Sequence, residues 1–170
     1  MPLPFLNNLD SLATLGTGIF AGTAFYMTSQ EVPALRDLGL DEHWRFFPHM
    51  YHRAFAYQGL VNGAASVAAI VHGLRITNSD FDRKLWIGAG AAFLALWPYT
   101  LLVMVPTNNQ IVDDNKKMTQ GVPSSVEPAR RKEMLEKWNC MHAVRTAVGM
   151  GAFGLMIYGL ARHASLVFKQ

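Results

Sequence analysis

Apolar and polar segments alternate along the 170-residue chain. Four segments of about 20 residues are almost free of charge, which is enough helix to cross a bilayer core of about 30 Å: residues 11–28, 54–74, 85–105 and 142–161. Only Arg145 interrupts them. Buried helices of soluble proteins usually keep a polar stripe at every turn, whereas three of these segments run their whole length without a charge. The pattern predicts an all-α integral membrane protein, a four-helix bundle that forms a single domain over residues 1–170.

The first apolar segment is interpreted as a retained span. A signal peptide requires Lys or Arg before its apolar region, but none precedes this segment, and the first basic residue is Arg36. Small residues at four-residue spacing predict close packing of the spans: Gly18/Gly22, Gly59/Gly63, Gly88/Ala92 and Ala147/Gly151. Lys and Arg are too evenly divided between the two faces to fix the orientation. The endoplasmic reticulum and the mitochondrial inner membrane both remain open as locations.

Two long charged segments connect the spans on one membrane face. Residues 29–53 are expected to form a loop in which Pro33 and Pro48 limit any helix. Residues 106–137 are expected to form a second loop, within which the last helix already begins near Pro128, outside the bilayer. A short turn joins the spans on the other face. The predicted topology therefore gathers most polar residues into one layer.

Composition excludes several classes of function. The net charge is +3, and the one basic run, residues 130–132, is interleaved with glutamates. This is typical of a solvated helix face, so no nucleic-acid partner is predicted. The single Cys140 excludes an intrachain disulfide. The spans contain no histidine and carboxylate pair at ligand spacing, so no metal is predicted.

Polar and aromatic residues form stripes on three of the predicted helices. Trp138, His142 and Arg145 follow i, i+4 and i+7 spacing, which places them on one helix face. Comparable stripes lie on the two preceding spans: Tyr51, Phe55, Gln58 and Asn62, then Trp97, Leu101, Met104 and Asn108, with Thr107 beside them. Together they predict a pocket that is apolar and aromatic below and polar at its mouth.

Simpler interpretations stay open for individual members. Arg145 lies about one turn inside the predicted span, from which its side chain can extend to lipid phosphates. His142 is then an anchor at the membrane surface. Trp44 and Trp97 are interpreted as belt residues at the lipid–water interface, and His43 as a solvent residue.

Three motifs resemble a known family. They are HMYHRA (49–54), PYTLLVMVPTNNQI (98–111) and LEKWNCMHAVRTAVG (135–149). In this order they closely resemble the DUF1772 family, which includes the fungal anthrone oxygenases, and the resemblance extends over about residues 12–160. Ala54 departs from the glycine that often follows the family's arginine. The motif positions carried over are Tyr51, Arg53, Thr107, Asn108, Trp138, His142 and Arg145.

The resemblance implies cofactor-independent oxidation of an anthrone-type polycyclic aromatic to a quinone with O2. It implies catalytic roles for His142, the base, and for Arg145 and Asn108. The expected substrate-binding residues are Tyr51, Arg53, Phe55, Gln58, Thr107 and Trp138. The expected partners are the lipid bilayer and a hydrophobic aromatic or quinone-like molecule. The alternative is a non-catalytic accessory subunit of a larger membrane complex, for example a respiratory one, that binds lipid or quinone.

Overall fold

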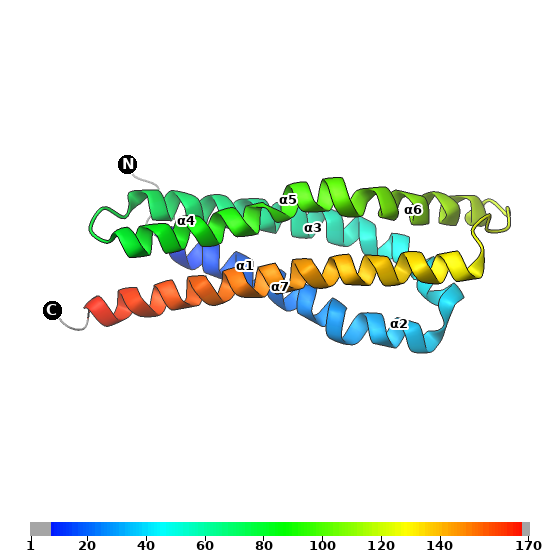
Figure 1. The fold of residues 1–170 in the computed structure, drawn as a ribbon, viewed down its shortest axis with the longest axis horizontal. Helices are drawn as coiled ribbons and strands as arrows, with labels where there is room; N and C mark the ends of the chain where they lie inside the picture. Colours follow the sequence, from blue (N-terminus) through cyan, green and yellow to red (C-terminus); the bar gives the residue numbers. More distant parts are fainter. Residues whose placement is uncertain (1–7, 168–170) are drawn as a thin grey trace.

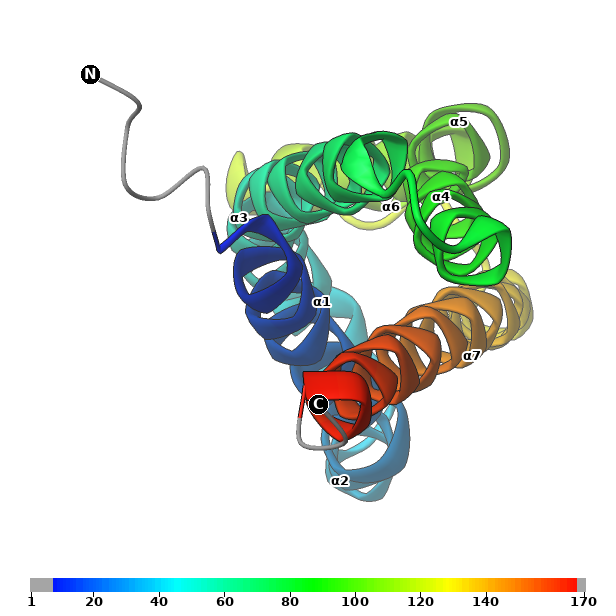
Figure 2. The ribbon, with the colours of Figure 1, turned by 90° about the vertical axis from the view of Figure 1, so that its left-hand side faces the viewer.

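The described chain consists of helices that join into four long rods. The computed structural model describes residues 8–167, with side chains up to His163. The first two rods contain α1 (Leu9–Tyr26), the π-helical turn η2 (Met27–Glu31), α2 (Val32–Leu38) and α3 (Leu40–Arg75). The other two contain α4 (Asp80–Leu94), α5 (Leu96–Tyr99), the π-helical turn η3 (Thr100–Met104), α6 (Val105–Thr119) and α7 (Pro128–Val167). The rods run along one axis (Figure 1), and α1, α3, α4 and α7 form a ring in the end-on view (Figure 2). The predicted all-α bundle is confirmed.

Three of the rods are long and apolar enough to cross a membrane: Leu40–Arg75, Asp80–Thr119 and Pro128–His163. They contain three of the four predicted spans. The remaining span, residues 11–28, falls mainly on α1, which is not among them and includes Asp10 and several Gly and Thr residues. These helices are consistent with a membrane protein. A fourth crossing by α1 stays a prediction.

The two predicted loops are wrong over most of their length, because the helices continue through them. Residues 29–53 are helical except at Gly39, and α6 covers residues 106–119. Pro33 and Pro106 each follow a π-helical turn by two residues. A π-helical turn widens the backbone, which relieves the clash between the proline ring and the preceding turn. In the second loop the non-helical residues 120–127 and the helix that begins at Pro128 match the prediction.

Pro48 lies inside α3 without breaking it. Because proline has no N–H, the carbonyl of Trp44, four residues earlier, loses its helical partner. Asn115 of α6 supplies a replacement, since its Nδ2 donates to Trp44 O at 2.9 Å. A contact between residues far apart in sequence therefore keeps α3 continuous.

Close helix packing occurs at different glycines from most of those predicted. A Cβ on Gly90 of α4 would come within 3.0 Å of the Ser66 carbonyl oxygen of α3, so only glycine fits there. Among the predicted pairs, Gly18 and Gly63 do lie against aromatic side chains of other helices. The other glycines of those pairs face open space: Gly22, Gly59, Gly88 and Gly151.

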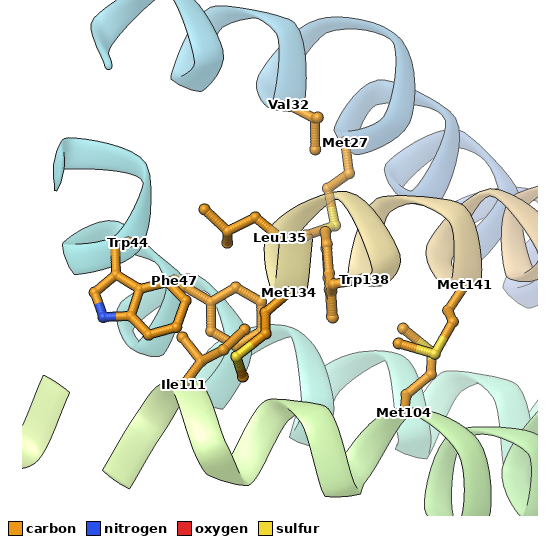
Figure 3. Packing of buried hydrophobic residues seen from close by; sticks show 10 residues of the cluster. All are labelled: Met27, Val32, Trp44, Phe47, Met104, Ile111, Met134, Leu135, Trp138 and Met141. Carbon is orange, nitrogen blue, oxygen red and sulfur yellow. The ribbon is translucent and has the colours of Figure 1, made fainter. Parts of the chain in front are cut away.

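The rod ends beyond the predicted spans pack around a hydrophobic core of their own. We call this part, residues 27–53 and 104–141, the cap. Its core draws on all four rods (Figure 3): Met27, Val32, Trp44, Phe47, Met104, Ile111, Met134, Leu135, Trp138 and Met141. Trp44 is fully buried in it, so its predicted place in a lipid-facing belt is wrong. His43 is buried too, which corrects its predicted place in solvent.

A buried carboxylate, Asp114, holds the cap together. Its Oδ2 accepts hydrogen bonds from Trp44 Nε1 at 3.0 Å and from Ser124 Oγ at 2.7 Å. Its Oδ1 accepts from the backbone N–H of Ser125 at 3.1 Å. Burial raises the pKa of this carboxyl, but the hydrogen bonds outweigh burial and hold the pKa below its usual value. Asp114 is therefore charged at neutral pH, and it joins α3, α6 and the turn before α7.

Candidate functional site

A cavity of about 350 Å³ lies between α3, the α5–η3–α6 rod and α7. Its volume is within the range of small-molecule sites in proteins. Phe20 of α1 and Met27 of η2 complete its wall, so all four rods contribute to it. Both π-helical turns border the cavity, because η2 supplies Met27 and η3 supplies Thr100, Leu101 and Met104.

Most of the predicted site residues line this cavity: Tyr51, Phe55, Gln58, Asn108, Trp138, His142 and Arg145. Asn62, Trp97, Leu101 and Met104 of the predicted stripes line it as well. Two predicted binding residues do not. Arg53 is exposed and borders a second hollow, between α1, η2 and α3, together with Glu31 and His49. Thr107 is buried without lining the cavity.

His142 is almost completely buried, with 2 % of its surface exposed. Its ring stacks on that of Trp138, with centroids 4.9 Å apart and an interplanar angle of 22°. Its Nδ1 lies 3.1 Å from Thr28 Oγ1, whereas its Nε2 has no partner within the described part of the chain. One side of the imidazole is therefore anchored to the protein, and the other remains available.

The anchor of His142 belongs to a small hydroxyl network. Thr28 Oγ1 lies 2.9 Å from the Ala24 carbonyl oxygen and 2.8 Å from Thr146 Oγ1. Thr146 Oγ1 also reaches the carbonyl oxygens of Ala24 and His142, each at 3.2 Å. The first rod and α7 are thus joined next to the imidazole. The sequence analysis missed Thr28 because α1 and η2 carry no stripe that points to α7.

Arg145 points into the bundle. Its Nη2 donates to Gln58 Oε1 at 2.9 Å, and its guanidinium lies 5.4 Å from the centre of the Phe20 ring. Its Nε has no partner among the described residues. The interpretation of Arg145 as a residue that extends to lipid phosphates does not fit these contacts.

Five buried polar atoms of cavity-lining residues lack hydrogen-bond partners within residues 8–163: Asn62 Oδ1, Asn108 Oδ1, Trp138 Nε1, His142 Nε2 and Arg145 Nε. We call the four on α6 and α7 the inner end. An unsatisfied buried polar group costs about 1–3 kcal/mol. Of the four inner-end atoms, two are donors, one is an acceptor, and the imidazole nitrogen can be either. The inner end is therefore suited to a ligand that carries oxygen atoms.

The large exposed side chains of the cavity lining are all apolar. We call them the mouth, and they belong to α3, α5 and η3: Phe55, Leu60, Trp97 and Leu101. The predicted polar mouth is wrong, since the polar layer is covered by the cap. Trp97 is not simply a belt residue either, because its ring borders the cavity and its Nε1 donates to Gly59 O at 3.1 Å.

The part of the chain whose side chains are described holds no group of three or more His, Cys, Asp or Glu residues placed to bind a metal ion. Phe20, one of several lining residues that were not predicted, packs edge-on against Phe93 with ring centroids 4.9 Å apart. Phe20 lies in an apolar segment with several similar residues. No sequence signal distinguishes it as part of the site.

Known proteins resemble this chain over most of its length. The family model described as Anthrone oxygenase matches residues 47–155, which carry nearly every residue of the cavity. An "Anthrone oxygenase" of Claviceps purpurea (strain 20.1) is 30% identical over 146 residues, 79% of this chain and 79% of the relative. "Anthrone oxygenase AgnL2" of Paecilomyces divaricatus is 27% identical over 143 residues, 80% of this chain and 86% of the relative. No solved structure matches. The match of the family model over more than half of the chain shows that the protein belongs to the anthrone oxygenase family, the DUF1772 family.

Proposed function

We propose that the protein oxidises an anthrone-type polycyclic aromatic to a quinone with O2. The single observation that carries this proposal is the inner end of the cavity, where the unpaired Nε2 of a buried histidine lines the same cavity as three other residues with unpaired polar atoms. Aromatic residues line the walls around them, among them Tyr51, Phe55 and Trp138. Membership of the anthrone oxygenase family supports the same reaction class.

The reaction needs one base that acts twice. His142 Nε2 takes a proton from the methylene carbon of the anthrone, which leaves an enolate. The enolate gives one electron to O2, and the resulting radical and superoxide join in a C–O bond. The imidazolium returns its proton to the peroxide. Removal of the second C–H proton then breaks the O–O bond, and the hydroxide that leaves takes up that proton. Anthrone and O2 thus give the quinone and one water, and the substrate supplies all the electrons.

The hydroxyl network supports Nε2 as the basic atom. The Ala24 carbonyl can only accept a hydrogen bond, so the Thr28 hydroxyl, 2.9 Å away, donates to it. Thr28 Oγ1 is then left as an acceptor for the Nδ1–H of His142 at 3.1 Å. This tautomer leaves the lone pair on Nε2, the nitrogen without a protein partner.

The other inner-end atoms fit the charge that develops during the reaction. Arg145 Nε and Trp138 Nε1 are donors without partners and are suited to an enolate oxygen. Asn108 Oδ1 is an acceptor and is suited to a phenolic hydroxyl of the substrate. The aromatic walls hold flat rings by stacking. In this account Arg145 and Asn108 stabilise charge and orientation, and His142 moves the protons.

The alternative, a non-catalytic accessory subunit of a membrane complex, uses the same cavity to hold lipid or quinone. The two relatives named as anthrone oxygenases support an enzyme instead. A purified protein that forms quinone without any partner protein distinguishes the two functions. The predicted independence from cofactors is examined in the same preparation.

The test compares His142→Ala with His163→Ala in protein reconstituted into lipid. Both residues are on α7, but His163 is exposed and does not line the cavity. Loss of a general base lowers kcat by about 100-fold or more. We expect this loss of quinone formation, after subtraction of spontaneous oxidation, in His142→Ala alone. Equal turnover in folded His142→Ala and wild-type protein would overturn the proposed role.

A further inference from the structure

We propose that the ligand enters this cavity sideways from the bilayer, between α3 and the α5–η3 segment. The inference rests on the proposed function for the class of ligand, an apolar polycyclic aromatic, but not on its oxidation. It concerns the route to the site.

The mouth faces the layer that lipid occupies. Its side chains are strongly exposed, with 44 % for Phe55, 47 % for Trp97, 50 % for Leu101 and 73 % for Leu60. All four belong to the charge-free spans 54–74 and 85–105. Apolar side chains exposed at this depth are stable because they contact acyl chains rather than water. An opening built from them therefore leads from the cavity into the hydrocarbon.

The cap covers the end of the cavity toward the aqueous face. Tyr51 and Trp138, which line the cavity, both pack on Phe47 of the cap core, with ring centroids 5.9 Å and 5.3 Å away. Phe47 is fully buried. A rigid three-ring molecule has no open path through this packed layer, so an entrance from that side requires the cap to unpack.

The second hollow offers the main competing route. It lies on the other side of α3 and shares Met27, Met50, Ala54 and Gln58 with the cavity. Met27 and Gln58 separate the two spaces, since Gln58 Nε2 lies 3.7 Å from Met27 Sδ and both residues are buried. Glu31, His49 and Arg53 line the hollow. The wall of Met27 and Gln58 closes this hollow off from the cavity, so it is a poor entrance for a rigid ring system.

Trp97 forms one edge of the mouth and bridges two rods. Its indole Nε1 donates to the Gly59 carbonyl at 3.1 Å, and a Cβ on Gly63 would come within 3.2 Å of its ring. The indole therefore packs against Gly63 of α3 and is held by one hydrogen bond to Gly59. A side chain in this position fixes the width of the opening, while Gly59 leaves free space beside it.

Three glycines with free space around their Cβ positions provide a matched test. Gly59 lines the cavity, Gly22 lines the second hollow, and Gly88 lines none of the described hollows. Each is changed to phenylalanine in protein reconstituted into lipid nanodiscs. The probe is 1-hydroxyanthraquinone, and its binding is followed by its own absorbance without turnover.

We expect Gly59→Phe to slow association and dissociation of the probe together, by about tenfold or more, because both use the same opening. Gly22→Phe and Gly88→Phe should stay within about twofold of wild type. Slower association in Gly22→Phe with normal rates in Gly59→Phe would overturn the inference in favour of the second hollow. Normal rates in all three variants would overturn it as well.

A second pair of variants covers the case in which Gly59→Phe does not fold. Leu101 lines the mouth, whereas its neighbour Leu102 is exposed outside the cavity. Leu101→Trp should slow binding and Leu102→Trp should not. Because no oxidation is measured, the outcome is separate from that of the His142→Ala assay. Quinone formation without any effect of the mouth variants overturns the route alone, and rates that follow the mouth without quinone formation overturn only the reaction.

Discussion

The inner end and the mouth of the cavity differ in the chemistry and the burial of their side chains. The inner end leaves buried polar atoms without partners, on Asn108, Trp138, His142 and Arg145. The mouth leaves large apolar side chains exposed, such as Leu60 and Trp97. Unpaired polar atoms are unfavourable in a protein core, and exposed apolar side chains are unfavourable in water. Each arrangement nevertheless suits one part of an amphipathic aromatic ligand.

The cap explains why these ends are so different. Its core includes Trp138 and packs against Tyr51, and it separates the inner end from the aqueous face. Electrostatic interactions are stronger in such a water-excluded space, so a few oriented donors have a large effect on a developing anion. The mouth has no comparable cover. The same bundle thus builds a dry polar site and an apolar entrance to it.

The largest effect is expected when the charge at the inner end is removed. Arg145→Met keeps the length and apolar volume of the side chain but removes the unpaired Nε–H and the donor to Gln58. Loss of stabilisation of a developing anion lowers kcat by about 100-fold. The measurement is the rate of quinone formation at saturating anthrone in lipid.

Arg130→Met is the matched control for Arg145→Met. Arg130 is exposed on the same helix and, among the residues whose side chains are described, forms an ion pair only with nearby Glu133, at 2.6 Å. Its replacement should leave kcat unchanged within about twofold, because exposed ion pairs contribute little. If Arg145→Met turns over as fast as Arg130→Met, the two ends of the cavity do not differ in chemistry, and the comparison fails.

A smaller effect on kcat is expected from Thr28, which contacts His142 but does not line the cavity. Thr28 contacts the side of His142 that faces away from the unpaired Nε2, so it acts as a positioning residue. Thr28→Val keeps the shape and removes the hydroxyl that fixes the tautomer. We expect kcat to fall by about tenfold through misorientation of the base, with KM unchanged.

Thr28→Ser distinguishes this role from a structural one. Serine restores the hydroxyl without the methyl group, so it should recover most of the lost kcat if the hydrogen bond is what matters. Recovery in Thr28→Ser but not in Thr28→Val sharpens the assignment of Nε2 as the base. Equal kcat values in both variants would contradict it, whatever their stability.

Much of the fold was predictable because lipid imposes a simple pattern. Charge-free segments of span length are helical in the structure, and α7 begins at Pro128 as predicted. The loops were not predictable, because helix continuation through Pro48 depends on Asn115, 67 positions away in sequence. Local sequence shows that proline removes a donor, but it does not show which distant side chain replaces it.

The site was predictable to the extent that helical spacing determines a face. The stripe of Trp138, His142 and Arg145 does face the cavity. Spacing does not reveal which rod packs opposite, so Phe20 and Thr28 of the first rod were missed. Nor does it show which end of a pocket is covered, which depends on the cap.

The most direct test of this account is a structure of the protein crystallised from lipid with a bound anthraquinone. The account predicts that the rings lie in the cavity between α3, α5–η3 and α7. One carbonyl oxygen should lie within hydrogen-bond distance of Arg145 Nε or Trp138 Nε1, and the ring edge should face His142 Nε2. An anthraquinone bound elsewhere, with these atoms still unpaired, would contradict the central claim that the inner end is the site of chemistry.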